Sequence, residues 1–233
     1  MNLAIILSGG VGSRMGGVIP KQYIDVCGKP VIWYCLKTFI ESPVVDVIVI
    51  ARSEDWSDCI GKVLSELNCT KTVLYSEPGE TRQYSIFNAL KVIAANHYSK
   101  DDKVIIHDAA RPLVSAKLIE DCLFSCDEVD AVLPVIPVKD TLYQSTDGQH
   151  VTSLLNRNEL FAGQAPEAFI FGKYLDLHHN MSREELLMIN GSTEIAYKGG
   201  LQVKLIKGEE MNFKITTPED LSNFESIIKH RTI

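Results

Sequence analysis

Short runs of apolar, often β-branched residues alternate with longer amphipathic stretches as far as Pro134, and this alternation constrains the fold more than any other feature. The expected strands are Leu3–Leu7, Asp46–Ala51, Thr72–Tyr75, Lys103–His107 and Ala131–Pro134. The expected helices are Pro30–Ile40, Glu54–Leu67, Ser85–Asn96 and Ala116–Cys126. Strands that alternate with helices predict a Rossmann-like α/β fold, in which a mostly parallel sheet carries helices on both faces.

After Pro134 the pattern changes. Ile136–Tyr143 and His150–Leu155, on either side of a turn at Asp147 and Gly148, predict two strands joined as a protruding β-arm at about 137–158. No linker rich in Pro, Gly or Ser divides the chain. We therefore expect residues 1–233 to form a single domain that carries this arm.

The last part of the chain predicts two more strands and a closing helix. The strands are Ile195–Lys198 and Leu201–Lys207. Thr217 is the expected N-cap of the helix, with Pro218 at its first position.

Charge and hydropathy exclude two classes of partner. The 23 Lys and Arg residues against 30 Asp and Glu residues give a net charge of −7, the wrong sign for a protein that coats nucleic acid or an anionic membrane. The longest apolar runs, such as Leu3–Leu7, are far shorter than the roughly 20 residues needed to cross a bilayer. The N-terminus lacks the basic region of a secretory signal. We therefore expect a cytoplasmic protein without nucleic-acid or membrane partners, which holds any phosphate ligand locally.

The six cysteines are scattered and include no Cys-x-x-Cys pair, so they indicate neither a zinc site nor a disulfide framework. We interpret them as small core residues. They are Cys27, Cys35, Cys59, Cys69, Cys122 and Cys126.

A glycine-rich loop follows the first expected strand, over Ser8–Gly17. It is not a dinucleotide fingerprint, because Met15 stands where that motif needs glycine, and it lacks the Lys-Ser/Thr of a Walker motif. Glycines let backbone N–H groups approach a phosphate, and Arg14 and Lys21 add two cations. A tight strand-to-helix turn with both cations solvated remains the alternative.

Two more polar loops follow strands whose carboxyl ends share one edge of the sheet, where ligands bind in open α/β folds. The loop at 79–85 leads into a helix N-terminus that can donate hydrogen bonds to a ligand, although Ser85 is also an ordinary N-cap. Asp108, at the end of the next strand, can position a divalent cation on a polyphosphate. The alternative is a capping Asp108 paired with Arg111, and we interpret His107 as a partly buried structural residue.

Six motifs in order, covering nearly the whole chain, resemble the methylerythritol-phosphate cytidylyltransferase family, which includes the related ribitol-phosphate cytidylyltransferases. The motifs are Ser-Gly-Gly-x-Gly-x-Arg-Met-x4-Pro-Lys-Gln at 8–22, Gly-x-x-Arg-x-x-Ser at 79–85, His-Asp-Ala-Ala-Arg-Pro at 107–112, Pro-Val-Lys-Asp-Thr-Leu at 137–142, Asn-Arg at 156–157 and Asn-x-Lys-Ile-Thr-Thr-Pro-Glu-Asp-Leu at 212–221. The resemblance implies a cytidylyltransferase that transfers CMP from CTP to a polyol phosphate.

The resemblance also implies roles for individual residues. The catalytic cations would be Arg14, Lys21 and Lys214. The residues that bind CTP would be Ser8, Gly9, Gly10, Gly12, Gly79, Glu80, Ser85 and Ala109. Those that bind the acceptor would be Asp108, Arg111, Thr141, Arg157 and Ser192, with Asp108 also near Mg²⁺. The arm would exchange between the subunits of a homodimer, bringing Thr141 and Arg157 to the neighbouring site.

The chemistry of such a reaction fits these residue types. A phosphate monoester has a second pKa near 6, so at pH 7 the acceptor is already an ionised nucleophile and needs no general base. Pyrophosphate leaves as an anion. The enzyme must therefore hold two anions in line and offset their repulsion, which calls for Arg, Lys and Mg²⁺.

Three positions depart from the family pattern on the acceptor side. Ala165 stands where Thr is usual, Ser192-Thr193-Glu194 replaces Thr-Asp-Glu and so loses a carboxylate, and Tyr143 stands where Lys is common. Loss of hydrogen-bonding groups can switch a substrate. We expect 2-C-methyl-D-erythritol 4-phosphate as acceptor, with ribitol 5-phosphate or glycerol phosphate as alternatives. A non-catalytic nucleotide-binding regulator and a nicotinamide oxidoreductase are the competing classes of protein.

Overall fold

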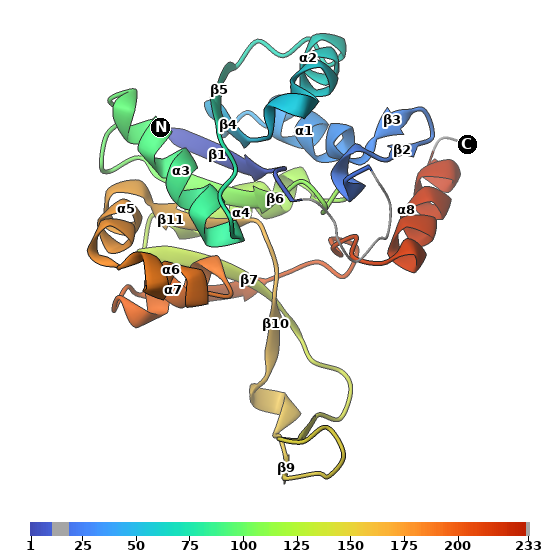
Figure 1. The fold of residues 1–233 in the computed structure, drawn as a ribbon, viewed down its shortest axis with the longest axis vertical. Coiled ribbons are helices and arrows are strands. Elements are labelled where there is room, and N and C mark those ends of the chain that lie inside the picture. The colour runs from blue at the N-terminus through green and yellow to red at the C-terminus, as the bar shows by residue number, and fades with distance from the viewer. Residues whose placement is uncertain (11–18, 232–233) are drawn as a thin grey trace.

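The protein is described here by a computed structural model that covers residues 1–10 and 19–231. Within these residues, eight strands form one sheet (Figure 1). Seven of them follow the order β10-β7-β11-β6-β1-β4-β5, and the eighth, β12, also pairs with β7. The strands are β1 (Asn2–Leu7), β4 (Val47–Ala51), β5 (Thr72–Ser76), β6 (Lys103–Asp108), β7 (Ala131–Pro137), β10 (Phe161–Gly163), β11 (Glu167–Ile170) and β12 (Val203–Lys207). Only β10 and β11 run antiparallel to their neighbours in this sheet. The predicted mostly parallel sheet is confirmed.

Helices cover both faces of the sheet, as the sequence predicts. One face packs against α1 (Val31–Glu41), α2 (Ser57–Glu66) and α4 (Ala116–Ser125). The other packs against α3 (Arg82–Ala95), α5 (Phe171–Asn180), α6 (Arg183–Met188) and α7 (Ser192–Lys198). The last helix, α8 (Pro218–Arg231), packs over a third cluster at one end of the sheet. Short 3₁₀ turns are η2 (Lys21–Tyr23), η3 (Glu54–Trp56) and η4 (Arg157–Glu159), and β2 (Asp25–Val26) pairs with β3 (Lys29–Pro30).

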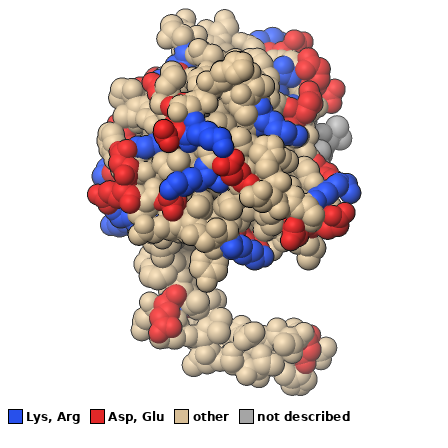
Figure 2. All heavy atoms as spheres, turned by 90° about the vertical axis from the view of Figure 1, so that its left-hand side faces the viewer, with Lys and Arg blue, Asp and Glu red and all other residues tan. Residues whose placement is uncertain are grey.

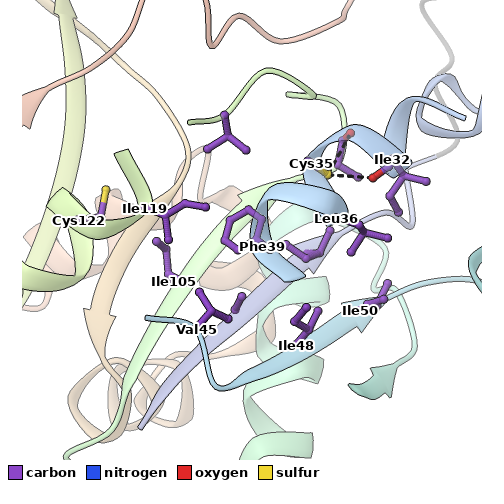
Figure 3. Close-up of a cluster of buried hydrophobic side chains, with 14 of the residues drawn as sticks. Ile32, Cys35, Leu36, Phe39, Val45, Ile48, Ile50, Ile105, Ile119 and Cys122 are labelled. Carbon is purple, nitrogen blue, oxygen red and sulfur yellow. Dashed lines mark hydrogen bonds between the residues drawn. The ribbon is translucent and has the colours of Figure 1, made fainter. Parts of the chain in front are cut away.

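The core follows from the alternation of side chains along the central strands. In β1, Ala4 and Ile6 face one core cluster, whereas Leu3 and Ile5 face the other. Figure 3 shows the first cluster, in which α1 side chains lie against the strands. Each fully buried Leu, Ile or Phe contributes about 1.5–3 kcal/mol relative to an exposed one. Burial on both faces therefore fixes the strands whose ends form the site described below.

The structure corrects one predicted strand. Ile195–Lys198 belongs to the helix α7 rather than to a strand, because Ser192, Ile195 and Ala196 recur at the spacing of a helix and are buried together. A short apolar run does not distinguish a strand from a buried helix turn. The closing helix begins at Pro218, and Thr217 Oγ1 accepts the Asp220 N–H at 3.2 Å, as predicted.

Residues 138–160 leave the main sheet between β7 and β10 (Figure 1). The two long strands predicted here are wrong, because only β8 (Tyr143–Gln144) and β9 (Ser153–Leu154) pair, in antiparallel register. Charged side chains of both signs are interspersed over the body of the molecule, whereas this projecting segment is mostly uncharged in the view of Figure 2. The proposed exchange of this segment between subunits stays a prediction.

The cysteines divide by position. Cys35, Cys122 and Cys126 are buried, as predicted, whereas Cys27 is exposed on the turn between β2 and β3, so its prediction as a core residue is wrong. Within the described residues, every helix is too short or too polar to cross a membrane.

Candidate active site

The carboxyl ends of β1, β4 and β6 lie side by side, because Leu7 pairs in parallel register with both Ala51 and Asp108. The loops that follow β1 and β6 therefore open at the same edge of the sheet. This is the edge at which open α/β sheets bind ligands.

Asp108 is the centre of an ion network at this edge. Its Oδ1 accepts a hydrogen bond from Arg82 Nε at 2.9 Å, and its Oδ2 accepts one from Lys214 Nζ at 2.8 Å. Burial alone would raise the pKa of Asp108, but Arg82 and Lys214 outweigh burial and hold this pKa well below its usual range. Asp108 is therefore ionised at neutral pH and fixes two cations beside it.

Arg82, the first residue of α3, joins Asp108 to a second buried carboxylate. Its Nη2 donates to Glu167 Oε1 at 3.3 Å, and its Nη1 donates to Ser192 Oγ. Burial alone would lower the pKa of Arg82, but Asp108 and Glu167 raise it above its ordinary value. Charge-assisted bonds of this kind are the strong ones in proteins.

Arg111 completes the cation set. Its Nη1 donates to the Asn212 carbonyl at 2.6 Å, and its Nε lies 4.0 Å from Asp108 Oδ2. Burial lowers the pKa of Arg111, although Asp108 opposes this effect. The alternative pairing of Asp108 with Arg111 is therefore present, but Asp108 also bonds to Arg82 and Lys214 at shorter distances. His107 is fully buried rather than partly buried, and its Nε2 lies 2.9 Å from the Arg111 carbonyl oxygen.

Lys214 reaches Asp108 from the segment that leads from β12 to α8. The Asn212 amide donates to the Ala165 carbonyl at 2.7 Å, and the Ile215 N–H donates to the Ala110 carbonyl at 2.8 Å. Asn212 and Ile215 are both completely buried. These anchors on either side of Lys214 hold it over the carboxyl end of β6.

A cleft of about 290 Å³ opens over this network. Its charged lining residues are Arg82, Asp108, Arg111, Glu167, Glu194 and Lys214. Its other lining residues are Leu133, Gly163, Gln164, Ala165, Asn190, Gly191 and Thr193. The cleft thus brings together Asp108, Arg111 and Lys214, although Lys214 is far from the other two in the sequence.

The start of the loop after β1 is held by the side chain of Ser8 and by Gln22 of η2. Ser8 is buried, and its hydroxyl donates to the Ala51 carbonyl at 2.9 Å. The Gln22 amide donates to the carbonyls of Ser8 at 2.6 Å and Gly10 at 2.8 Å, so η2 is fastened to this loop. A Cβ at Gly9 would lie 2.2 Å from Pro78 Cβ, whereas one at Gly10 would meet no atom of residues 1–10 or 19–231 within 4 Å. The loops after β1 and β5 therefore touch at Gly9.

The loop after β5 is shaped by Ser85. The N-cap of α3 is Thr81, whose Oγ1 accepts the Tyr84 N–H, so the prediction of Ser85 as N-cap is wrong. Ser85 Oγ accepts the Gly79 N–H at 2.9 Å and donates to the Thr81 carbonyl at 3.0 Å. A Cβ at Gly79 would lie 2.3 Å from Tyr84 Cβ, so only glycine fits this turn.

The remaining predicted residues fall into three groups. Glu80 lies exposed on the loop after β5 and pairs with Arg183 of α6 at 2.6 Å, and Ala109 is fully buried behind the cleft. Thr141 and Arg157 lie exposed on the segment 138–160 and do not line the cleft of the described chain. Lys21 is half-buried at the start of η2, and Gly12 and Arg14 lie outside the described residues.

Ser192 is placed differently from its predicted role. It is completely buried, and its single hydroxyl hydrogen is donated to Glu167 Oε1 at 2.9 Å. Ser192 therefore supports the wall of the cleft and has no hydrogen left for an acceptor.

Sequence reasoning missed Arg82 and Glu167 as parts of the site. Arg82 stands inside the motif at 79–85, directly before an expected helix, and that position was a usable signal. Glu167 opens a buried strand with a carboxylate, which indicates a paired charge but not the identity of its partner.

Comparisons with known proteins decide between the classes considered above. The family model for 2-C-methyl-D-erythritol 4-phosphate cytidylyltransferase matches residues 2–230. The chain belongs to that family. This cytidylyltransferase is 36% identical over 228 residues to the 2-C-methyl-D-erythritol 4-phosphate cytidylyltransferase of Clostridium beijerinckii, a match that covers 97% of this chain and 98% of the relative. It is a CTP-dependent nucleotidyltransferase with 2-C-methyl-D-erythritol 4-phosphate cytidylyltransferase activity, as predicted.

Solved structures share the fold of this cytidylyltransferase. The crystal structure of the 2-C-methyl-D-erythritol 4-phosphate cytidylyltransferase of Francisella tularensis is 28% identical and superposes with a TM-score of 0.79, covering 96% of this chain and 99% of that one. The 4-diphosphocytidyl-2C-methyl-D-erythritol synthase of Anaerococcus prevotii DSM 20548 is 24% identical with a TM-score of 0.82, covering 98% and 96%. The second comparison supports the fold alone.

Proposed function

We propose that the cleft over Asp108 is where this enzyme joins CTP to 2-C-methyl-D-erythritol 4-phosphate. The observation that carries the proposal is the set of three cations, Arg82, Arg111 and Lys214, held around one buried carboxylate in a cleft of about 290 Å³. Such a set of fixed positive charges suits phosphate groups.

The reaction needs no proton acceptor. An oxygen of the acceptor phosphate attacks the α-phosphorus of CTP, the bond from that phosphorus to the oxygen bridging to the β-phosphate breaks, and pyrophosphate leaves. At pH 7 the nucleophile is already ionised. The residues of the cleft therefore act by orienting two anions and offsetting their repulsion.

Lys214 is the cation we assign to the reacting phosphates. Its ammonium carries three donors, and Asp108 takes one of them, so two remain for phosphate oxygens. Arg111 lies beside it and faces the same cleft. We assign Arg14, in the glycine-rich sequence at 8–17, and Lys21, at the start of η2, to the triphosphate of CTP.

The nucleotide side of the site is assigned to the loops after β1, β5 and β6. No atom of the described residues lies within 4 Å of a Cβ placed at Gly10, and a glycine there would let phosphate oxygens approach the backbone. Gly79, Glu80 and Ala109 would lie around the cytidine, with Ser8 and Ser85 shaping the two loops from behind. Glu80 is the exposed carboxylate of this group and is able to accept a hydrogen bond from a base amino group.

A divalent cation, which we propose to be Mg²⁺, fits this site mainly through its substrate. Among the described residues there is no cluster of three or more metal-ligating side chains. Asp108 is the only cleft carboxylate assigned to the metal, and both of its oxygens already bond to cations. Mg²⁺ is commonly held by one or two carboxylates together with substrate phosphates. When bound, it would neutralise charge on the triphosphate, with Asp108 as the contributing side chain.

We further propose that two copies of the chain share each site. Thr141 and Arg157 lie on the projecting segment, away from the cleft of their own chain. The same segment exposes the apolar side chains of Tyr143, Val151 and Leu154, each more than 60% accessible. Exposed apolar groups gathered on one segment indicate a surface that a partner covers. A second copy that covers this segment would receive Thr141 and Arg157 at its acceptor phosphate.

The cytoplasmic location stays a prediction.

The test is pyrophosphate release by the purified protein with CTP and Mg²⁺. It compares 2-C-methyl-D-erythritol 4-phosphate, ribitol 5-phosphate and glycerol phosphates at equal concentrations. We expect a preference for the first acceptor by at least about a hundredfold in kcat/KM, because glycerol phosphates lack a hydroxyl that the site would bond, and ribitol 5-phosphate places its hydroxyls on a longer, unbranched chain. Preference for ribitol 5-phosphate or a glycerol phosphate would contradict the acceptor that we assign.

A further inference from the structure

Glu167 is a buried carboxylate that neither the motifs nor the reaction chemistry assigns. Its side chain is 8% accessible and forms four hydrogen bonds. Oε1 accepts from Ser192 Oγ at 2.9 Å and from Arg82 Nη2 at 3.3 Å. Oε2 accepts from the Thr193 N–H at 3.0 Å and from Thr193 Oγ1 at 2.6 Å. Burying a charge is costly unless it is paired, so this arrangement is a built contact.

The contact fastens the first turn of α7. The N-cap of this helix is Gly191, which has no side chain to bond the free N–H groups of the turn. Glu167 Oε2 accepts the N–H of Thr193, the second residue of the helix, and so replaces the missing cap from a different element. Asn190, Gly191 and Thr193 line the cleft. One wall of the cleft is therefore fixed to β11 by a single carboxylate.

The same carboxylate orients Arg82. Asp108 holds Nε of the guanidinium, while Ser192 and Glu167 hold Nη1 and Nη2. A guanidinium has five N–H donors, so two remain for a ligand once these three bonds are formed. Removing Glu167 would leave the guanidinium with its bonds to Asp108 and Ser192. Ser192 would itself lose the carboxylate to which its hydroxyl donates.

The position of this carboxylate also accounts for one departure from the family pattern. The sequence carries Thr193 where the pattern has Asp, which removes a carboxylate from the acceptor side. In the structure, a carboxylate oxygen of Glu167 lies 2.6 Å from the Thr193 hydroxyl. The negative charge is thus present in the wall, but β11 carries it instead of α7.

We propose that Glu167 is the positioning residue of the acceptor half of the cleft, and that it supplies from β11 the carboxylate that Thr193 lacks. This inference rests on the proposed function, because it concerns the acceptor of that reaction. Glu167 acts through Arg82 and through the first turn of α7. It therefore governs the affinity for the polyol phosphate and leaves the affinity for CTP unchanged.

The first experiment is steady-state kinetics of Glu167→Gln with both substrates varied. The amide keeps the size of the side chain but loses the charge and places an N–H₂ group against the donors of Arg82 or Thr193. We expect KM for 2-C-methyl-D-erythritol 4-phosphate to rise at least about tenfold and KM for CTP to stay within about twofold, because charge-assisted hydrogen bonds are lost on the acceptor side only. Glu185→Gln, which removes the charge of the capping carboxylate of the neighbouring helix α6, is the matched control and should leave both KM values unchanged.

The second experiment moves the carboxylate back to α7. In the double variant Glu167→Gln/Thr193→Asp, the carboxylate introduced on α7 can accept from the amide introduced on β11 and from the first turn of the helix. We expect KM for the acceptor to return to within about threefold of the wild type, as coupled groups in contact are non-additive. Thr193→Asp alone places two carboxylates together and should raise this KM.

The outcomes separate this proposal from the proposed function. Wild-type protein that turns over none of the polyol phosphates overturns the proposed function and this proposal with it. Wild-type turnover together with an unchanged acceptor KM in Glu167→Gln, or an equal rise in both KM values, overturns this proposal alone. If Glu167→Gln does not fold, Thr193→Ala replaces it, because it removes one hydrogen bond from the carboxylate. An acceptor KM raised about threefold, the loss of one modest hydrogen bond, then supports the proposal, and an unchanged KM overturns it.

Discussion

The ion network around Asp108 and the projecting segment 138–160 both carry predicted acceptor residues, but they hold them differently. In the network, Arg82 and Lys214 bond to a carboxylate that is 11% accessible, and each is anchored by its own chain. On the segment, Arg157 is exposed and its Nη1 donates to the Lys139 carbonyl at 2.9 Å. A buried carboxylate therefore fixes a cation before any substrate arrives, whereas an exposed cation needs something outside its own chain to fix it.

This difference predicts where a substitution acts. Within the network, the same bonds serve folding and phosphate binding, so both stability and turnover should respond. On the segment, a substitution should lower turnover and leave the stability of the chain unchanged, because exposed ion pairs and hydrogen bonds contribute little to folding. Substitutions in the two regions test this separation and are taken in order of decreasing effect.

Lys214→Ala should have the largest effect on turnover. It removes the cation with two donors free for phosphate oxygens, and we expect kcat to fall about 10³-fold, as for loss of a donor to a developing oxyanion. The measurement is pyrophosphate release at saturating CTP and acceptor. Lys204→Ala, which breaks an exposed ion pair with Glu128, is the matched control and should keep the wild-type rate. A Lys214→Ala enzyme within tenfold of the wild type would contradict the role of this residue.

Asp108→Asn should lower both stability and turnover. The Asn side chain has one acceptor oxygen in place of two charged ones, so Arg82 or Lys214 loses its partner, and we expect the free energy of unfolding to fall by about 3 kcal/mol at pH 7. Since the pKa of Asp108 lies below its unfolded value of about 3.9, this contribution is complete above that value and is lost as the pH falls below it. Urea unfolding of both proteins at pH 7 and below pH 4 checks this, because their difference should shrink in acid.

His107 predicts a different pH window in the same network. Its Nε2 faces the Arg111 carbonyl, and its Nδ1 is buried without a hydrogen-bond partner among the described residues. Burial lowers the pKa of His107 to about 4, because protonation would add an unpaired N–H in the core. As the pH decreases from about 6.5 to 4, the unfolded chain therefore binds a proton that the folded chain does not. The free energy of unfolding should fall by up to about 3 kcal/mol over this pH range.

The measurement for His107 is the free energy of unfolding at half-unit steps from about pH 7.5 to 4, which spans the window between the two pKa values. His178 is also buried with its pKa lowered to about 4, so it contributes in the same direction. His107→Asn should flatten the curve without abolishing its slope. A wild-type curve that is level across this window would contradict the buried neutral state of both rings.

The central part of this fold could be predicted because local pattern and tertiary packing agree there. Strands such as Leu3–Leu7 are buried on both faces and read as continuous apolar runs, and the helices between them carry one apolar face. At Ile195–Lys198 the pattern was too short to specify a period, and packing against α5 and β12 decided for a helix. Strand β11 could not be placed, because its position between β6 and β7 depends on partners that lie far away in the sequence.

The candidate site could be predicted for the residues that stand in motifs at strand ends, such as Asp108. The sequence could not predict which group bonds to which. Asp108 has Arg111 as its neighbour in sequence, but the fold gives its oxygens to Arg82 and Lys214. Ser192 looked like a ligand of the acceptor, yet Glu167 and Arg82 take up its hydroxyl. These pairings are set by the meeting of five separate segments of the chain, and no local spacing encodes them.

Arg157→Ala tests the projecting segment 138–160 and should have the smallest effect of these substitutions. We expect kcat/KM for the acceptor to fall about 30-fold, the loss of one charge-assisted contact, with thermal stability unchanged because Arg157 is exposed. Lys139→Ala, on the same segment and in an exposed ion pair with Glu210, is the control variant and should keep near wild-type activity.

Mixing the Lys214→Ala and Arg157→Ala variants tests whether the segment 138–160 of one subunit reaches the cleft of the other. Each Lys214→Ala homodimer lacks the network cation at both sites, and each Arg157→Ala homodimer lacks the segment cation at both. In a mixed dimer that exchanges segments, one site loses both cations and the other keeps both. Half of the dimers in an equal, equilibrated mixture are mixed, so activity should recover to about a quarter of the wild type for a two-fold symmetric pair. If both cations of a site came from one chain, every site in the mixture would lack one of them. The activity would then equal the mean of the two variants, and the segment would have no role in the neighbouring cleft.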